Sequence, residues 1–226
     1  DLVDPSRRLD PAAARRFFET RILGQPEACA RFAHVVFLLK AGLTAPDTPI
    51  GSFLFTGPTG VGKTESALTL AEYLFGDRER LTRLDMSEYG DPAAALRLVD
   101  GRRGEGALTQ AVLNRPFGIV LLDEIEKADG GVLDLLLQVL GEARLTDGRG
   151  RLVSFRHTVV ILTSNLGAGE RAPVGFENMT DPSARYAKAV ERALRPELLN
   201  RIDHVVPFRS LSREVLETLA DRLVKA

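Results

Sequence analysis

The sequence has a single cysteine and no long uninterrupted apolar segment. Cys29 has no second cysteine with which to form a disulfide. No apolar run approaches the ~20 residues that a helix needs to span a bilayer. These absences favour a reducing, aqueous compartment, and we predict a cytoplasmic protein with no membrane partner. The chain also begins without methionine and without a signal-peptide core, so we expect a module of a longer protein.

The chain also lacks a charge excess and is poor in aromatic residues. Thirty basic and thirty-one acidic residues give a net charge of −1, and aromatic residues make up 6% of the sequence. A nucleic-acid motor needs a basic groove with stacking aromatics, and neither the charge nor the aromatic content supplies one. We therefore predict no nucleic-acid partner, and any phosphate binding must be local.

Five short apolar runs alternate with helical segments and predict an α/β fold with a parallel sheet. The runs are 52–56, 81–85, 118–122, 158–163 and 205–208. The third and fourth are nearly continuous Val, Ile and Leu, which is typical of central strands covered on both faces. With 226 residues, 44% of them apolar, the chain is large enough to bury a substantial core.

Other segments indicate helices and one inserted hairpin. Helical patterns run up to residue 20 and over 26–41, with Pro26 suited to the first turn of the second helix. Residues 44–51 form a surface loop. Asp147-Gly148, within 144–155, is typical of a β-hairpin turn.

A glycine-rich loop between the first strand and a helix is the strongest chemical signal. It reads Gly57-Pro58-Thr59-Gly60-Val61-Gly62-Lys63-Thr64 and is followed by Glu65. Such glycines let backbone N–H groups converge on phosphate oxygens at a helix N-terminus. Lys63 adds a charge near the β and γ phosphates, and the Thr64 hydroxyl can ligate Mg²⁺. A plain turn that ends a strand is the alternative, and it leaves the order of strand, loop and helix unexplained.

Two carboxylates follow the third apolar run. Asp123 and Glu124 come directly after Ile119-Val120-Leu121-Leu122, where open parallel sheets place their ligand sites. In this position Asp123 would hold Mg²⁺ or its waters, and Glu124 would polarise the water that attacks the γ-phosphate. Paired acids also occur in solvated loops that end a strand. The catalytic interpretation of Asp123 and Glu124 therefore depends on the phosphate loop elsewhere in the same sheet.

Taken together, the motifs resemble an AAA+ ATPase module, most closely the second ATPase module of Clp-type unfoldases and disaggregases. The resemblance covers nearly the whole chain and rests on Ile22-Leu23-Gly24-Gln25, Pro49-Ile50-Gly51-Ser52-Phe53-Leu54-Phe55, Asp85-Met86-Ser87-Glu88-Tyr89, Leu121-Leu122-Asp123-Glu124-Ile125-Glu126-Lys127-Ala128, Leu136-Leu137-Gln138-Val139-Leu140, Gly150-Arg151, Thr163-Ser164-Asn165-Leu166-Gly167 and Arg195-Pro196-Glu197-Leu198-Leu199-Asn200-Arg201-Ile202-Asp203. It implies a five-stranded parallel P-loop NTPase sheet flanked by helices. It also implies ATP or ADP with Mg²⁺ as ligands, a hexameric ring, and a protein client or adaptor.

The resemblance assigns further roles residue by residue. Ile22 and Leu23 would contact the adenine, and Asn165 matches the polar residue called sensor 1, which holds the hydrolytic water or touches the γ-phosphate. Arg201 matches the arginine finger that reaches into a neighbouring subunit's site. A surface ion pair with Asp203 is the alternative for Arg201. Arg195 matches a second motif arginine.

Two departures from the Clp pattern concern the pore loop and the lid. The segment 98–109 is shorter than in the pattern and has no aromatic residue to grip a polypeptide. Arg102 and Arg103 in this segment either contact an acidic partner or are simply solvated, and charge clusters usually are solvated. The resemblance further implies a lead over 1–18, a nucleotide-binding domain over 19–208 and a lid that begins at 209–226 and stops before the sensor 2 element.

The sequence thus predicts a Mg²⁺-dependent ATPase module of a ring machine that remodels, unfolds or disaggregates proteins. An ATP-dependent assembly scaffold or switch that threads no polypeptide stays open, because the pore aromatic is missing.

Overall fold

A five-stranded parallel sheet forms the centre of the molecule. The computed structural model describes residues 11–100, 106–167 and 182–225. The strand order is β2-β3-β6-β1-β7, with all four pairings parallel. The strands are β1 (Gly51–Thr56), β2 (Leu81–Asp85), β3 (Gly118–Asp123), β6 (Thr158–Ser164) and β7 (His204–Pro207). Each boundary lies within one residue of the sequence expectation, and the α/β fold is confirmed.

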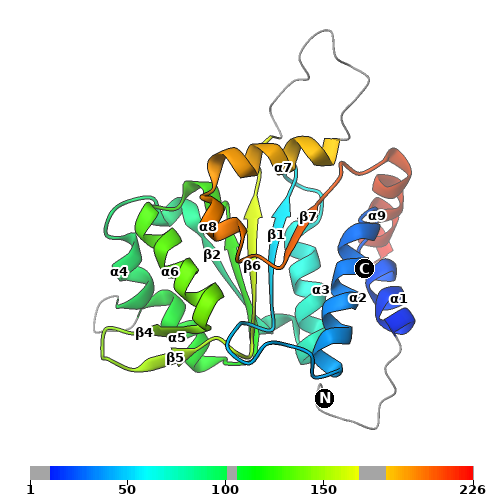
Figure 1. Cartoon of the computed structure of the whole chain (residues 1–226). Coiled ribbons are helices and arrows are strands. Elements are labelled where there is room, and N and C mark those ends of the chain that lie inside the picture. The colour runs from blue at the N-terminus through cyan, green and yellow to red at the C-terminus, as the bar shows by residue number, and fades with distance from the viewer. Residues whose placement is uncertain (1–10, 101–105, 168–181, 226) are drawn as a thin grey trace.

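Helices cover both faces of this sheet, as Figure 1 shows. They are α1 (Pro11–Arg21), α2 (Pro26–Lys40), α3 (Lys63–Phe75), α4 (Ala94–Val99), α5 (Ala107–Asn114), α6 (Gly130–Glu142), α7 (Pro182–Ala193), α8 (Pro196–Leu199) and α9 (Arg213–Lys225), with short 3₁₀ turns at Arg78–Arg80, Met86–Tyr89 and Ile125–Lys127. Helices α1, α2 and α3 cover one face, and α4, α5 and α6 cover the other. The result is a three-layer sandwich.

Strand alternation divides the core between the two faces. Successive side chains of a strand point to opposite faces of a sheet. On β3, Ile119 and Leu121 pack with α3, whereas Val120 and Leu122 pack with α6. Both β3 and β6 are interior strands, which explains their continuous burial. The predicted central position of these two strands is confirmed.

Parallel register brings the ends of the interior strands to one edge. Thr56 of β1 pairs with Ser164 of β6, and Asp85 of β2 pairs with Asp123 of β3. Residues that follow these strands therefore share the carboxyl edge of the sheet, the edge at which α/β proteins bind ligands.

The inserted hairpin forms as expected. Strands β4 (Arg144–Thr146) and β5 (Leu152–Ser154) pair antiparallel. Asp147 shapes the turn, because its Oδ1 accepts hydrogen bonds from the backbone N–H groups of Arg149 and Arg151 at 3.0 and 2.8 Å.

Helix α1 is part of the packed molecule. Its Ala14 and Phe18 are buried in the same core cluster as the helix α2 residue Phe32. The boundary expected between residues 18 and 19 therefore falls inside a helix. In the described part of the chain, no helix combines the length and apolar character needed to cross a membrane.

Candidate functional site

The loop between β1 and α3 leaves the start of α3 open to an anion. Gly62 is the N-cap of α3, with a φ of 99°, and no side chain caps the helix. A Cβ at Gly62 would meet nothing within 4 Å, whereas one at Gly57 would lie 2.4 Å from the Phe208 carbonyl oxygen. The first N–H groups of a helix lack intrahelical partners and favour negative charge. The start of the loop at Gly57 thus packs closely against Phe208, whereas its end at Gly62 leaves space for a ligand.

The Lys63 ammonium lies inside the loop. Its side chain is buried and donates to Gly57 O at 2.6 Å, to Pro58 O at 3.1 Å and to Asn165 Oδ1 at 2.5 Å. Burial lowers the pKa of Lys63 to about 8, although Asp123, Glu126 and Glu124 act in the opposite direction. These hydrogen-bond acceptors are uncharged, so the geometry favours an added anion beside the ammonium.

Asp123 is fixed by hydrogen bonds at both carboxylate oxygens. The Thr163 hydroxyl donates to Asp123 Oδ1, and the Arg83 guanidinium donates to Oδ2 from Nε at 3.0 Å and from Nη2 at 2.5 Å. The Asp123 side chain is only 13% exposed. A carboxylate with both oxygens engaged is held in one orientation at the edge of the sheet.

Glu124 has an unusual backbone conformation for a residue with a side chain. Its φ of 55° and ψ of 53° lie in the left-handed region. A non-glycine residue there costs of order 1–3 kcal/mol, and such residues cluster at functional sites. The Glu124 N–H donates to the Thr163 hydroxyl at 3.1 Å, and the Glu124 side chain pairs with Lys127. This conformation ends β3 and directs the carboxylate toward Asn165.

Asn165 joins the phosphate loop to Glu124. Its Oδ1 accepts from Lys63, and its Nδ2 donates to Glu124 Oε1 at 3.0 Å. Its backbone N–H donates to Glu126 Oε1 at 3.0 Å. A side-chain amide accepts through its oxygen and donates through its nitrogen, so one rigid group can bridge a cation and a carboxylate. The side chain that the family resemblance assigns to sensor 1 thus contacts both Lys63 and Glu124.

The segment expected to contact adenine lies next to the phosphate loop. Ile22 is buried in the core and Leu23 is half-buried. Gln25 is buried, and its Nε2 donates to Val61 O at 3.2 Å and to Arg209 O at 2.8 Å. A Cβ at Gly24 would lie 3.1 Å from Leu211, at the start of the expected lid. Of the two apolar candidates, Leu23 is the more accessible to a base.

The remaining loop residues differ in exposure. Pro58 is half-buried, Thr59 and Gly60 are exposed, and Val61 is buried. The half-buried Thr64 lies in the first turn of α3. The exposed Glu65 carboxylate accepts two hydrogen bonds from Arg78, at 2.8 and 2.9 Å.

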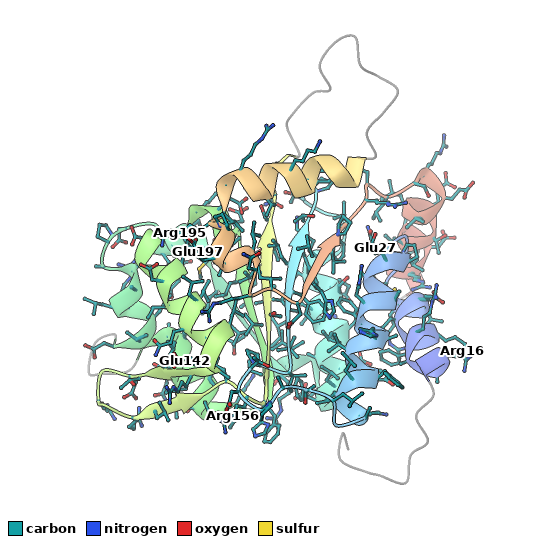
Figure 2. The ribbon with its side chains drawn as sticks, in the orientation of Figure 1. Arg16, Glu27, Glu142, Arg156, Arg195 and Glu197 are labelled. Atoms are coloured by element: carbon teal, nitrogen blue, oxygen red, sulfur yellow. The ribbon has the colours of Figure 1, made fainter. Side chains whose placement is uncertain are left out.

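The two motif arginines contact helix α6. Arg201 is exposed, and its Nη1 donates to Leu137 O at 3.2 Å. Arg195, labelled with Glu197 in Figure 2, forms an ion pair with Asp134 at 2.6 Å. The alternative of an Arg201–Asp203 ion pair does not occur, because Asp203 Oδ2 instead accepts from Ser52 N at 2.8 Å and from Ser52 Oγ at 2.7 Å. Arg201 is therefore not tied to an acidic side chain of its own segment.

Several contacts of the site were not predicted from the sequence. They involve Gln25, Arg83, Glu126, Lys127 and Thr163. Lys127 stands three residues after Glu124 and Thr163 two before Asn165, so spacing alone could have indicated both. The pairing of Arg83 with Asp123 depends on the register of two strands 40 residues apart. Arg102 and Arg103, expected in the shortened loop, lie outside the described residues.

The donor set fits a nucleotide with Mg²⁺. The uncapped helix start and Lys63 suit phosphate, and the hydroxyl of Thr64 and the carboxylate of Asp123 are the hard oxygen ligands that Mg²⁺ prefers. Glu126 Oε2 is also buried without a hydrogen-bond partner, beside Asn165. A buried acceptor of this kind is explained by a ligand or an ordered water.

Comparisons with known proteins agree with this geometry. The family described as "AAA domain (Cdc48 subfamily)" matches residues 48–205. The "Negative regulator of genetic competence ClpC/MecB" of Bacillus subtilis is 45% identical over 225 residues, which cover 91% of this chain and 28% of that protein. The "Chaperone protein ClpB" of Corynebacterium diphtheriae is 50% identical over 207 residues, covering 89% and 23% respectively. The chain spans about a quarter of the length of these relatives.

A solved structure shares the fold. It is described as "Closed State CryoEM Reconstruction of Hsp104:ATPyS and FITC casein" and superposes with a TM-score of 0.82 at 34% sequence identity. The match covers 95% of this chain and 38% of that one.

Proposed function

The chain belongs to the AAA domain family, Cdc48 subfamily, and on this premise we propose that it is an ATP-binding and ATP-hydrolysing module of a Clp-type machine that remodels proteins. The observation that carries the proposal is the hydrogen-bonded series Lys63–Asn165–Glu124. It joins a phosphate-binding loop to a carboxylate through one amide. Such a series links the presence of a γ-phosphate to the position of a general base.

Each residue of the site has a part in the proposed hydrolysis. The N–H groups at the start of α3 bind the phosphates. The Lys63 ammonium then donates to phosphate oxygens in place of the loop carbonyls. Bound Mg²⁺ neutralises phosphate charge, and Thr64 and Asp123 would hold it. Glu124 accepts a proton from the attacking water, while Asn165 keeps the carboxylate in place. Ile22 and Leu23 would contact the base.

Arg201 supplies its charge to a neighbouring copy in the proposed assembly. It is exposed and bonds only a backbone carbonyl among the contacts that the structure records for it. A guanidinium that reaches a transferring phosphoryl group stabilises the charge that develops there. We accordingly propose a homo-oligomeric ring, hexameric as in the resembling family. The same proposal includes a nucleotide-binding domain up to residue 208 into which helix α1 packs, a lid that begins at 209–226, and a cytoplasmic location.

The proposed ligands of the whole machine are a nucleotide and a protein client. The relative Hsp104 was solved with ATPyS and FITC casein, as its description states. A second candidate function is favoured by the lack of any aromatic residue in 98–109. In it, nucleotide binding drives assembly with a partner and no polypeptide is threaded. Hydrolysis without unfolding of a stable tagged substrate would support this second candidate.

Nucleotide titration of this chain tests the proposed site. We expect the parent chain to bind fluorescent ADP or ATP, and Lys63→Ala to weaken binding about tenfold or more, since it loses a charge-assisted contact with phosphate. Lys40→Ala is the control, because Lys40 ends α2 and has no role in the site. Equal affinity of the Lys63→Ala and parent chains would contradict the proposal.

A further inference from the structure

Arg83 is an exposed residue that bonds a nearly buried carboxylate of the site. The Arg83 side chain is 53% exposed, whereas the Asp123 side chain that it contacts is 13% exposed. Both Nε and Nη2 donate to the same oxygen, Asp123 Oδ2. This two-donor contact is more specific than a point-charge attraction, because the guanidinium plane fixes the direction of approach.

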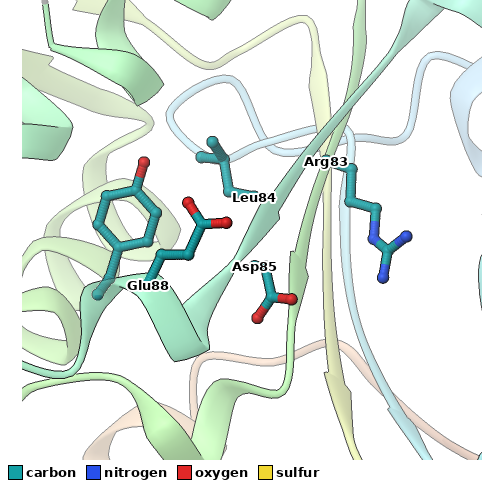
Figure 3. Close-up of a pocket in the computed structure, with 5 residues that line it drawn as sticks. Arg83, Leu84, Asp85 and Glu88 are labelled. Atoms are coloured by element: carbon teal, nitrogen blue, oxygen red, sulfur yellow. The ribbon is translucent and has the colours of Figure 1, made fainter.

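The pairing of β2 with β3 sets this contact. Arg83 lies opposite Leu121, and Asp85 lies opposite Asp123, so Arg83 reaches diagonally across one strand spacing. Figure 3 shows the Arg83 side chain pointing away from Glu88. These two residues, with Leu84, Asp85 and Tyr89, line a shallow cavity of about 290 Å³.

The nearby carboxylate of Asp85 has other partners. Asp85 Oδ1 accepts from Ser87 N at 2.9 Å and from Ser87 Oγ at 2.6 Å, and these bonds lower the pKa of Asp85. The hydrogen bonds that the structure records for Arg83 go to Asp123 alone. Arg83 therefore bonds the residue of the site rather than the nearest acid of its own strand.

The hydrogen bonds to Asp123 leave one acceptor site of its carboxylate open. A carboxylate oxygen has two lone pairs. Arg83 occupies both on Oδ2, and the Thr163 hydroxyl occupies one on Oδ1. One lone pair of Oδ1 is left. We propose that Arg83 is a positioning residue that makes Asp123 present Oδ1 to Mg²⁺ or its water. The inference rests on the proposed nucleotide site.

An ordinary surface ion pair would have a different signature. Exposed pairs contribute about 0–1 kcal/mol to stability and act on no ligand. A residue that orients a metal ligand instead changes metal affinity by about 10–100-fold. The quantity that separates the two roles is the gain in nucleotide affinity on adding Mg²⁺, measured apart from hydrolysis.

The test measures binding of a fluorescent ADP to this chain with excess Mg²⁺ and with EDTA. For Arg83→Ala we expect the gain from Mg²⁺ to fall about tenfold while affinity in EDTA stays within about twofold of the parent. Arg83→Lys restores part of the gain, because it returns the charge without the two-donor geometry. Arg144→Ala is the control, since Arg144 of the hairpin strand β4 forms an exposed ion pair with Glu142 at the end of α6.

Three outcomes would overturn the inference. In the first, Mg²⁺ raises the nucleotide affinity of Arg83→Ala as much as that of the parent. In the second, Mg²⁺ raises it more, which would make Arg83 a competitor of the cation. In the third, Arg83→Ala loses the same amount of affinity with Mg²⁺ as with EDTA. Arg83→Gln, checked for folding by its thermal unfolding curve, replaces Arg83→Ala if the latter does not fold. If the parent chain itself bound no nucleotide, the proposed function would fail and this inference with it. If Mg²⁺ raised the nucleotide affinity of the parent and of Arg83→Ala equally, only the role of Arg83 would be contradicted, and the proposed nucleotide site would stand.

Discussion

At the scale of single residues, Lys63 has the clearest link between environment and function. It is a buried cation whose recorded hydrogen bonds go to the uncharged oxygens of Gly57, Pro58, Ser164 and Asn165. Burial disfavours its charged form and lowers its pKa to about 8, so part of the population is neutral in mildly alkaline solution. Phosphate oxygens would favour the charged form again.

Nucleotide binding should therefore take up protons at alkaline pH. At pH 8 we expect about half a proton per bound nucleotide, because roughly half of Lys63 is neutral before binding and nearly all is charged afterwards. Calorimetric titration in buffers of different ionisation enthalpy measures this number. Lys63→Met should abolish the uptake, and no uptake by the parent chain would contradict the assigned environment of Lys63.

The same lowered pKa has a defined effect on folding. The unfolded chain holds this proton up to a pH near 10.4, whereas the folded chain releases it near pH 8. Between these values the unfolded state binds more protons, so the contribution of Lys63 to stability rises with pH. Without nucleotide, the charged lysine thus destabilises the fold below pH 8.

At the scale of elements, helix α6 provides a surface for the proposed arginine finger. A Cβ built on Gly141 would lie 1.4 Å from Arg201 Nη1, so the guanidinium occupies the space that a side chain at this position would need. Glycine inside a helix costs about 1 kcal/mol relative to alanine. The Arg201 side chain thus lies over Gly141 and donates to Leu137 O on the same helix.

A double-mutant cycle tests this packing. In an Arg201→Ala background, Gly141→Ala should raise the free energy of unfolding by about 1 kcal/mol, the helix-propensity difference. In the parent background the gain should be smaller, because the new methyl group displaces the guanidinium from Leu137 O. Urea denaturation gives both values. Equal gains in the two backgrounds would show that Arg201 does not occupy this place in solution.

Elements are also the scale at which the sequence predicts most. The bounds of the five strands and the hairpin follow from apolar runs and turn residues, because those signals are local. The phosphate loop and the acidic pair were equally visible, since each follows a strand directly. Contacts such as Gln25 with Arg209, or Ser52 with Asp203, join residues 184 and 151 positions apart. Strand register and packing decide such contacts, and one sequence does not reveal them.

At the scale of the whole molecule, the proposed function requires a group from a neighbouring copy of the chain. Arg201 lies against α6, whereas Lys63, Glu124 and Asn165 form a separate hydrogen-bonded series. A finger that acts across a subunit boundary has no effect in an isolated subunit. Activity should then depend on assembly.

Mixing experiments test this dependence in the protein that carries the module. We expect specific ATPase activity to rise with protein concentration as rings form. Subunits with Arg201→Ala should depress the activity of a mixture below the proportion of parent subunits present, because each removes the finger from a neighbour's site. Arg144→Ala subunits provide the control. Concentration-independent activity together with a harmless Arg201→Ala change would rule out a finger acting in trans.

The measurement that tests the central claim most directly compares nucleotide binding and ATP hydrolysis by Glu124→Gln and by the parent. Glutamine keeps the shape of the side chain but does not accept the proton of the attacking water. We predict nucleotide affinity within about threefold of the parent and hydrolysis at least about a hundredfold slower. Glu19→Gln on helix α1 should retain the parent rate. Hydrolysis by Glu124→Gln at the parent rate would contradict the assignment of Glu124 as the general base.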